Sequence, residues 1–326
     1  MRIFQNVKFE TNPTLIASWP GMGNVGLIAT NYLRSKLNAQ PLAEIDMNPY
    51  FIPEAILVRN GIADLPKTPT SRIYFSQSPD VLIFESDAQI SGREGLAVAK
   101  SLMRFAADVG VRRVLTTAAL PQNISHKVKS QVFGAYTDQS LALDFERIGV
   151  IPMIEGYIAG LNGVLLGIAK SHSIEAGCFL GTIPLFATNL SYPKTSLKII
   201  ELLEDLLNID IDKTEINQSI IITDSQFSAI EERIRQFSGL ILGGGGQAAP
   251  NPLDEIWGSE QQESGGAYSE TIPQTIMEKI ERLFQDAQDD KSRANTLKKE
   301  LDRWNVYELY EDRFLKLFKL DGSKNE

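Results

Sequence analysis

Short continuous apolar runs alternate along the first 215 or so residues with segments whose apolar residues recur every three or four positions. The apolar runs predict buried strands at 14–19, 80–85, 113–117 and 177–183. Weaker runs predict further short strands at 55–58, 72–75 and 150–154. Helical spacing predicts helices at 26–38, 95–109, 140–148, 162–172 and 196–207. Because strands and helices alternate, we expect an α/β domain with a parallel sheet covered by helices on both faces.

Beyond this domain the pattern changes twice. A further helix is predicted at 224–237, and it closes a first domain of residues 1–238. Residues 239–272 are rich in glycine, with four consecutive glycines at 243–246, and predict a flexible linker. Residues 273–326 mix acidic and basic residues and predict a helical tail.

Within the tail, residues 297–320 predict an amphipathic helix with an unusual number of aromatic residues on its apolar stripe. The stripe includes Trp304, Tyr307, Tyr310 and Phe314. Aromatic side chains dominate binding hot spots, so these four are predicted to bind a partner. The alternative, that the stripe covers the protein's own core, fits the same pattern.

Composition narrows the class of protein. The 326 residues are 43% hydrophobic and 22% charged, which is typical of a globular chain. The single cysteine, Cys178, excludes an intramolecular disulfide and fits the cytoplasm. No apolar run is long enough for a membrane span, so no membrane association is expected. The net charge of −9 disfavours nucleic acid as the main partner.

A glycine turn lies between the first predicted strand and the first predicted helix. Gly21, Gly23 and Gly26 fit the pattern G-x-G-x-x-G, with Asn24 inside the turn. Such a turn can bring a phosphate to backbone N–H groups at a helix N-terminus, so these four residues are the candidate cofactor-binding residues. A tight turn with close helix–sheet packing explains the same glycines without a ligand.

Two observations favour the purely structural explanation of this turn. Glu44 and Asp46 lie about 20 residues further on, where a dinucleotide site places its ribose carboxylate, but the segment after Asp46 has the composition of a loop. Trp19 and Pro20 precede the first glycine, where a nucleotide-binding strand usually has small or apolar residues. No cofactor is therefore predicted.

Catalytic and metal-binding residues are not predicted. His126 and His172 lack histidine or cysteine neighbours at metal-ligand spacing, and Cys178 lies in an apolar strand, where it is expected to be a core residue. A polar group after the strand at 80–85 could line a pocket or form surface pairs; its members are Glu85, Asp87, Arg93 and Glu94.

Two segments in this order resemble a known family. They are residues 19–33, beginning Trp-Pro-Gly-Met-Gly-Asn-Val-Gly, and residues 156–170, Gly-Tyr-Ile-Ala-Gly-Leu-Asn-Gly-Val-Leu-Leu-Gly-Ile-Ala-Lys. The second is followed by a small-residue strand at 177–182 and by Tyr-Pro-Lys-Thr-Ser-Leu at 192–197. Over roughly residues 1–215 the chain resembles the proteasome assembly chaperone family, in its archaeal and bacterial branch related to the second eukaryotic assembly chaperone.

The resemblance implies a three-layer α/β/α sandwich, similar to nucleoside phosphorylases but without their catalytic residues. It also implies a homo-oligomer with protein partners, proteasome-related subunits among them. Members that dock on proteasomes do so through a C-terminal hydrophobic-Tyr-any tripeptide, whereas residues 321–326 here are Asp-Gly-Ser-Lys-Asn-Glu. The expected function is non-enzymatic protein binding of the assembly-chaperone type. The alternative is an enzyme or sensor, ATP-grasp-like or dinucleotide-binding, that holds a nucleotide or phosphate at residues 21–26.

Overall fold

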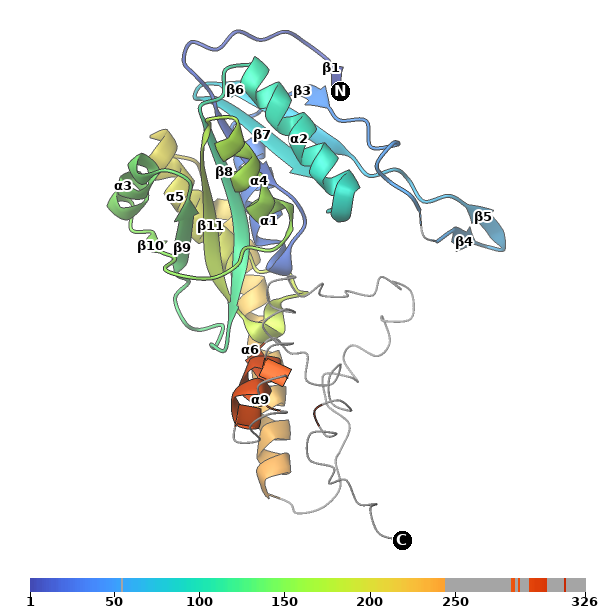
Figure 1. Ribbon diagram of the computed structural model, residues 1–326, viewed down its shortest axis with the longest axis vertical. Helices are drawn as coiled ribbons and strands as arrows, with labels where there is room; N and C mark the ends of the chain where they lie inside the picture. The colour runs from blue at the N-terminus through green and yellow to red at the C-terminus, as the bar shows by residue number, and fades with distance from the viewer. Residues whose placement is uncertain (54, 244–282, 285–286, 288–292, 304–313, 315–326) are drawn as a thin grey trace. The chain divides into compact units, whose positions relative to one another are not determined.

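The computed structural model describes residues 1–53, 55–243, 283–284, 287, 293–303 and 314 of the 326-residue chain (Figure 1). Two compact units share the chain, the first formed by Met1–Gly246 and the second by Gln247–Glu326. The first unit contains the predicted α/β domain. In the second unit, the described helix is α9 (Ala294–Arg303).

A nine-stranded mixed sheet forms the centre of the first unit (Figure 1). From edge to edge its strands are β1 (Arg2–Ile3), β3 (Gln40–Glu44), β6 (Ser71–Gln77), β7 (Asp80–Ser86), β2 (Thr14–Ser18), β8 (Arg113–Gln122), β11 (Glu175–Pro184), β9 (Val132–Tyr136) and β10 (Ile151–Pro152). The four central strands β7, β2, β8 and β11 are parallel, as predicted.

The outer strands correct the expectation of a wholly parallel sheet. β6 runs antiparallel to β7, and β9 runs antiparallel to β11. Only residues 78–79 join β6 to β7, and a connection this short can link only antiparallel neighbours. β3 and β9 were not expected as strands, because Pro41 in β3 and Gly134 in β9 weaken the strand pattern.

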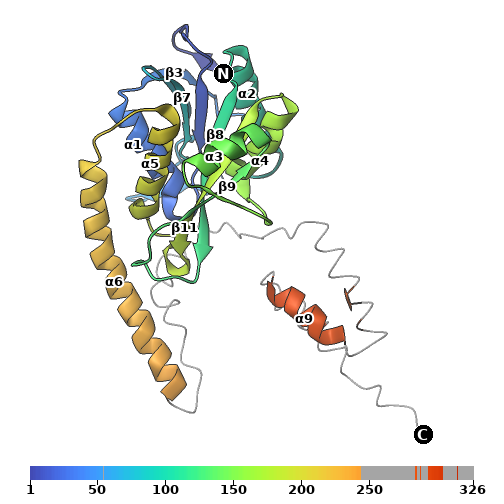
Figure 2. The same cartoon turned by 90° about the vertical axis from the view of Figure 1, so that its left-hand side faces the viewer.

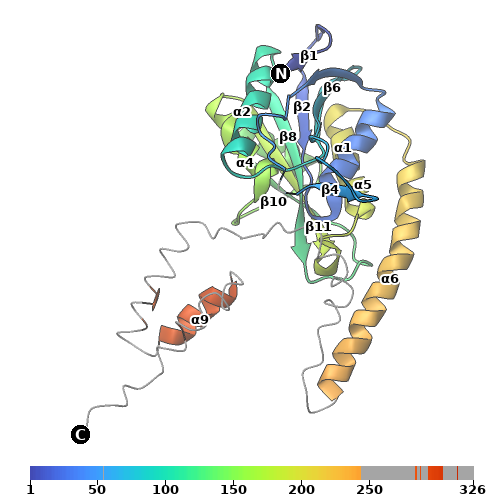
Figure 3. The ribbon, with the colours of Figure 1, turned by 90° about the vertical axis from the view of Figure 1, so that its right-hand side faces the viewer.

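Helices cover both faces of the sheet, which confirms the three-layer α/β/α architecture (Figures 2 and 3). One face packs against α2 (Gly92–Asp108) and α4 (Gly160–Ser171). The other face packs against α1 (Val25–Lys36), α3 (Gln139–Arg147) and α5 (Pro193–Leu207). The two hydrophobic cores therefore lie on opposite sides of one sheet.

β8 and β11 form the buried centre of the sheet and pair along ten residues each. Side chains alternate along β11, so Cys178 and Leu180 enter the core under α2 and α4. Phe179 and Ile183 enter the core under α1 and α5. Cys178 is thus the core residue that the sequence predicts, and burial raises the pKa of its thiol to about 12.

The helix predicted at 224–237 is longer at both ends and forms α6 (Thr214–Gly243). Its first part includes the β-branched run at 220–223, which has low intrinsic helix propensity. Packing of Ile216 and Phe227 into the core overrides this propensity. α6 continues past residue 238, the predicted end of the first domain, while residues 244–272 of the predicted linker lie outside the described residues.

The strand predicted at 55–58 does not join the main sheet. Residues 57–59 form β4 (Leu57–Arg59), which pairs only with β5 (Ile62–Asp64) as a separate hairpin. Asn60 and Gly61 make the turn with φ of 51° and 78°. This hairpin projects from the body of the sandwich (Figure 1).

Candidate functional site

The glycine turn lies between β2 and α1, at the carboxyl ends of the central strands. Gly23 has φ of +65°, a conformation that glycine adopts without strain. Its N–H donates to the carbonyl of Thr188 at 2.7 Å, and its carbonyl accepts from the N–H of Tyr192 at 2.8 Å. Both backbone groups of Gly23 are therefore bonded to the segment that follows β11.

Gly26 brings the first turn of α1 against the sheet. A Cβ at this position would lie 2.4 Å from the hydroxyl oxygens of both Ser18 and Thr117. These two hydroxyls are buried and hydrogen-bonded to each other at 3.1 Å. Gly26 is thus needed for close helix–sheet packing.

The four candidate cofactor-binding residues have different environments. Gly23 and Gly26 are buried, whereas Gly21 and Asn24 are exposed. Asn24 is the N-cap residue just before α1; it has a left-handed conformation, with φ of 47°, and makes no capping hydrogen bond through its side chain.

Asn162 is a residue of this region that sequence reasoning did not single out. Its side-chain oxygen accepts from the N–H of Trp19 at 3.1 Å, and its backbone carbonyl accepts from the hydroxyl of Thr116 at 2.7 Å. The two glycine segments therefore meet in space, although they are far apart in the sequence. The signal that could have found Asn162 is a polar residue within an otherwise apolar helix.

The second glycine segment, residues 156–170, has glycines at 156, 160 and 163 around the start of α4. Gly160 and Gly163 are half-buried, and Gly160 has φ of +75° beside Gln89. Gly156 is exposed in the single chain. The glycines at the start of α4 are thus close to the core, whereas Gly156 lies in the exposed loop before it.

The candidate ribose carboxylates lie far from the glycine turn. Glu44 is at the end of β3, and β7 and β6 separate that strand from β2. Three inter-strand spacings correspond to about 14 Å. Glu44 forms an ion pair with Arg72 at 2.7 Å, and Asp46 accepts from the N–H of Asn48. The sheet topology therefore does not bring these carboxylates to the turn as a dinucleotide site would require.

The polar group at and after the end of β7 does not form one cluster. Glu85 forms an ion pair with Arg34 of α1 at 2.8 Å, and burial raises the pKa of Glu85 despite this guanidinium. Asp87 accepts hydrogen bonds from the N–H and the hydroxyl of Thr70. Arg93 and Glu94 are exposed in the first turn of α2. Glu85, near the end of β7, is thus paired with α1, and Asp87, just after β7, is bonded to Thr70.

His126 is buried in a polar contact between the loop after β8 and α6. Its Nδ1 lies 2.8 Å from a carboxylate oxygen of Glu231, and its Nε2 lies 3.0 Å from the hydroxyl of Ser228. Burial raises the pKa of Glu231, but hydrogen bonds from the N–H and ring of His126 and from Ser125 outweigh it, so the pKa is lowered overall. His172, by contrast, is exposed at the end of α4.

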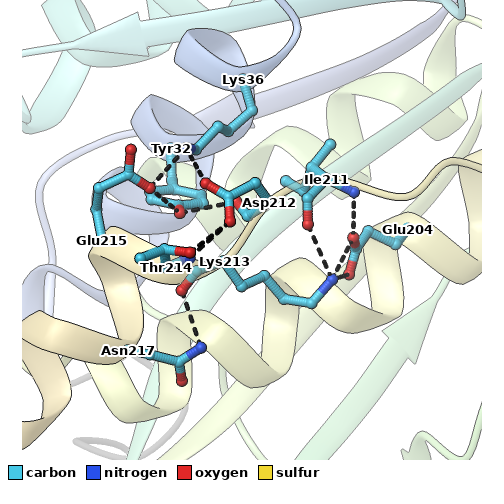
Figure 4. Close-up of polar contacts among 9 residues, drawn as sticks. All are labelled: Tyr32, Lys36, Glu204, Ile211, Asp212, Lys213, Thr214, Glu215 and Asn217. Carbon is cyan, nitrogen blue, oxygen red and sulfur yellow. Dashed lines mark hydrogen bonds and ion pairs between the residues drawn. The ribbon is translucent and has the colours of Figure 1, made fainter.

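A second polar contact holds the start of α6 against α1 (Figure 4). Lys36 forms ion pairs with Asp212 at 2.9 Å and Glu215 at 2.6 Å. The Tyr32 hydroxyl donates to the Asp212 carbonyl at 2.8 Å. Hydrogen bonds from Lys36 hold the pKa of Asp212 well below its usual range. α6 is therefore attached to the sandwich at both of these contacts.

The projecting hairpin carries a group of exposed apolar side chains. We call residues 55–65 the hairpin arm. Its exposed apolar residues include Ile56, Leu57, Val58, Ile62 and Leu65, with Leu65 70% exposed. Clusters of exposed apolar side chains mark interaction sites, so the arm is a candidate protein-binding surface.

The predicted partner-binding residues of the tail are only partly described. Phe314 is buried and lies at a helical position. Trp304, Tyr307 and Tyr310 lie outside the described residues. In α9, the start of the predicted tail helix, Leu297 and Leu301 are buried four positions apart.

Neither a metal cluster nor a membrane-spanning segment is found in the described part of the chain. No group of three or more His, Cys, Asp or Glu side chains there could hold a metal ion. None of the described helices is long and apolar enough to cross a bilayer.

Comparison with known protein families identifies the family of this chain. The family model described as "PAC2 family" matches residues 15–231, well over half of the chain. The chain belongs to the PAC2 family. The match confirms the resemblance noticed in the two glycine segments. The matched region begins in β2 and ends within α6, at residue 231.

Individual relatives are distant. The uncharacterized protein MJ1210 of Methanocaldococcus jannaschii is 22% identical over 209 residues, which cover 64% of this chain and 78% of that protein. Among solved structures, PbaB of Pyrococcus furiosus, described as an archaeal proteasome activator, matches with a TM-score of 0.60 and 23% identity over 70% of this chain and 97% of PbaB.

Two further structures share the fold of this PAC2 family chain. PbaA of Pyrococcus furiosus, described as an archaeal homolog of proteasome-assembly chaperone, has a TM-score of 0.58 and 19% identity over 79% of this chain and 98% of PbaA. Rv2125 of Mycobacterium tuberculosis, described as a proteasome-assembly chaperone homologue, has a TM-score of 0.56 and 19% identity over 66% of this chain and 94% of Rv2125.

Proposed function

We propose that this PAC2 family chain is a cytoplasmic, non-enzymatic binding protein of the assembly-chaperone type that associates with itself and with protein partners. Its similarity to PbaB, PbaA and Rv2125 supports the proposal, because their descriptions connect them with proteasome activation or assembly. Proteasome-related subunits are therefore the first partners to test.

The observation that supports binding over catalysis is the occupation of the glycine turn by the chain itself. In open α/β sheets, ligands bind beyond the carboxyl ends of the strands. Here both backbone groups of Gly23 bond to Thr188 and Tyr192, and Gly26 packs on Ser18 and Thr117. These groups stabilise the turn and are not directed at a phosphate.

We further propose that the aromatic stripe of the tail contributes to partner binding. Trp304, Tyr307 and Tyr310 recur at three-residue intervals, a spacing that places them on one side of a helix. They lie beyond the part of the chain that the family model matches. The tail would thus give this protein a contact that the shared fold does not supply.

Affinity capture tests the protein-binding proposal. Full-length protein is immobilised and exposed to an extract of its source organism and, separately, to purified proteasome core particles. We expect specific enrichment of a protein that is reduced by Tyr307→Ser and retained by the control Lys299→Ser, an exposed position of α9. Failure to enrich any protein over a blank matrix in both experiments would contradict the proposal.

Thermal shift tests the nucleotide or phosphate alternative. A ligand at 100 times its dissociation constant stabilises the native state by about 2.7 kcal/mol, which a melting curve detects. We expect no shift with ATP, NAD or phosphate. A clear shift that Asn24→Ala reduces would indicate a ligand site at the turn and overturn the non-enzymatic proposal.

A further inference from the structure

A cavity of about 390 Å³ lies between α2 and α4, the two helices that cover one face of the sheet (Figure 1). Cavities of about 300–1,000 Å³ hold small molecules, so this volume suits a small ligand. Gly167 of α4 lines the cavity, and a Cβ at this position would meet no atom within 4 Å. The missing side chain of Gly167 therefore leaves room for a ligand between the helices.

The wall formed by α2 is positively charged. Lys100 and Arg104 lie four positions apart on this helix, which places them on the same side, and both line the cavity. No carboxylate among the described residues lines the cavity or forms an ion pair with either cation. In a chain with a net charge of −9, these two neighbouring cations are thus available to bind an anion.

The wall formed by α4 is mostly apolar. Val164 and Ile168 line it, and His172 lies at its end. The Ser171 hydroxyl already donates to the Ile168 carbonyl at 2.7 Å, so we do not count it as a donor to a ligand. The imidazole of His172 can donate one N–H even when it is neutral. The cavity thus has cations on one side and an apolar surface on the other.

These two walls select the class of anion. An apolar wall favours a ligand with an apolar body, which leaves water on binding. The last turn of α4 carries partial negative charge on its carbonyl groups and borders the cavity, so it opposes a doubly charged group more than a singly charged one. Arginine binds a carboxylate through two parallel N–H donors, and lysine adds a point charge. A carboxylate joined to an apolar chain or ring therefore matches the cavity better than a phosphate does.

We propose that the cavity between α2 and α4 binds a small carboxylate with an apolar body. The carboxylate lies against Arg104 and Lys100, and the apolar body lies against Val164 and Ile168. This site is separate from the glycine turn, which leads into α1 on the opposite face of the sheet. The inference goes beyond the proposed protein binding and does not depend on it.

Isothermal titration calorimetry of the full-length protein with octanoate tests this inference. Octanamide is the neutral comparison, because it has the same chain and lacks the charge. Octyl phosphate is the second comparison, because a phosphate monoester carries a charge of about −1.5 to −2 at neutral pH. We expect octanoate to bind at least about tenfold more tightly than octanamide, and more tightly than octyl phosphate.

Three variants locate the site. Arg104→Gln removes a cation of the cavity and should weaken octanoate binding at least about tenfold. Gly167→Leu fills the cavity and should weaken the binding of octanoate and octanamide alike. The matched control is Arg93→Gln, which removes the same kind of cation from the first turn of α2, outside the cavity, and should leave the affinity within about twofold. All three positions are exposed, so we expect each variant to remain folded, which melting curves check.

Several outcomes would overturn the inference. Absence of octanoate binding to the wild type would do so, and so would equal affinities for octanoate and octanamide. Binding that neither Arg104→Gln nor Gly167→Leu weakens would place the ligand elsewhere on the protein. Tighter binding of octyl phosphate, lost in Arg104→Gln, would overturn the choice of a carboxylate and assign the cavity to phosphate esters. Protein capture is measured separately, so none of these outcomes decides the proposed function.

Discussion

The side-chain oxygen of Asn162 accepts a hydrogen bond at 3.1 Å from the backbone N–H of Trp19, 143 positions earlier in the chain. This bond joins the start of α4 to the residue that follows β2, just before the glycine turn. Asn162 and Trp19 are both buried. The bond therefore ties together the two segments by which the family is recognised.

Replacing Asn162 should be costly. Asn162→Ala leaves the Trp19 N–H buried without its acceptor, and an unsatisfied buried donor costs about 1–3 kcal/mol. Urea unfolding measures the loss. The control is Lys100→Ala on the exposed surface of α2, which should change stability by less than about 0.5 kcal/mol. Equal stabilities of the two variants would show that the Asn162 bond is not needed.

Two helical glycines should respond in opposite directions to alanine. A Cβ on Gly26 would collide with Ser18 and Thr117, so Gly26→Ala should destabilise by about 1–3 kcal/mol through overpacking. A Cβ on Gly167 meets nothing within 4 Å, so Gly167→Ala should stabilise by about 0.5–1 kcal/mol. Thermal melting of both variants checks the signs. A neutral Gly26→Ala would contradict the close packing of α1 on the sheet.

Gly23→Val should destabilise the fold by more than about 1 kcal/mol, because a left-handed conformation strains a β-branched residue. A Cβ there would also lie 3.1–3.3 Å from Val25, Ile183 and Tyr192. Gly149→Val separates the two causes, since Gly149 also has positive φ but no atom within 4 Å of the added Cβ. We expect the Gly23 variant to melt at the lower temperature. The reverse order would show that the contacts around Gly23 relax freely.

Glu231 should make stability depend on acid pH. Its pKa is lower in the folded protein than the usual 4.5, so the unfolded state binds more protons as the pH falls. The contribution of ionised Glu231 to the free energy of unfolding is fully present when the pH is above this usual pKa. It is lost as the pH falls through the pKa of the folded protein. We expect Glu231→Gln to be less stable than the wild type near neutral pH, with the difference shrinking below about pH 4.5.

Chemical denaturation at a series of pH values measures this difference. Glu232→Gln is the control, because Glu232 is exposed next to the same site. A difference between wild type and Glu231→Gln that stays constant down to about pH 3 would contradict the assignment of the lowered pKa to Glu231.

Limited proteolysis should separate the sandwich from the tail. The glycines at 243–246 and the glycine-rich sequence up to Tyr268 predict the first cuts between 239 and 268. A stable fragment of about 240 residues should remain, and mass spectrometry identifies its end. First cuts within residues 1–215 would place the domain boundary elsewhere.

Local sequence patterns determined much of the architecture. β2, β7, β8 and β11 are continuous apolar runs, and α1, α2, α4 and α5 have apolar residues at helical spacing. Both patterns follow from burial along a regular element, so each can be recognised without knowing its neighbours. The family resemblance was visible for the same reason, because its glycines and apolar residues lie in contiguous segments.

Contacts between distant segments could be known only from the tertiary structure. Strand pairing is one example, because no local pattern names a strand's partner. It places β3 three strands away from β2, makes β9 antiparallel to its neighbour, and leaves β4 and β5 as a separate hairpin. The same holds for Asn162 on Trp19 and for His126 on Glu231. Sequence spacing determines which face of an element is apolar, but chain topology decides what that face meets.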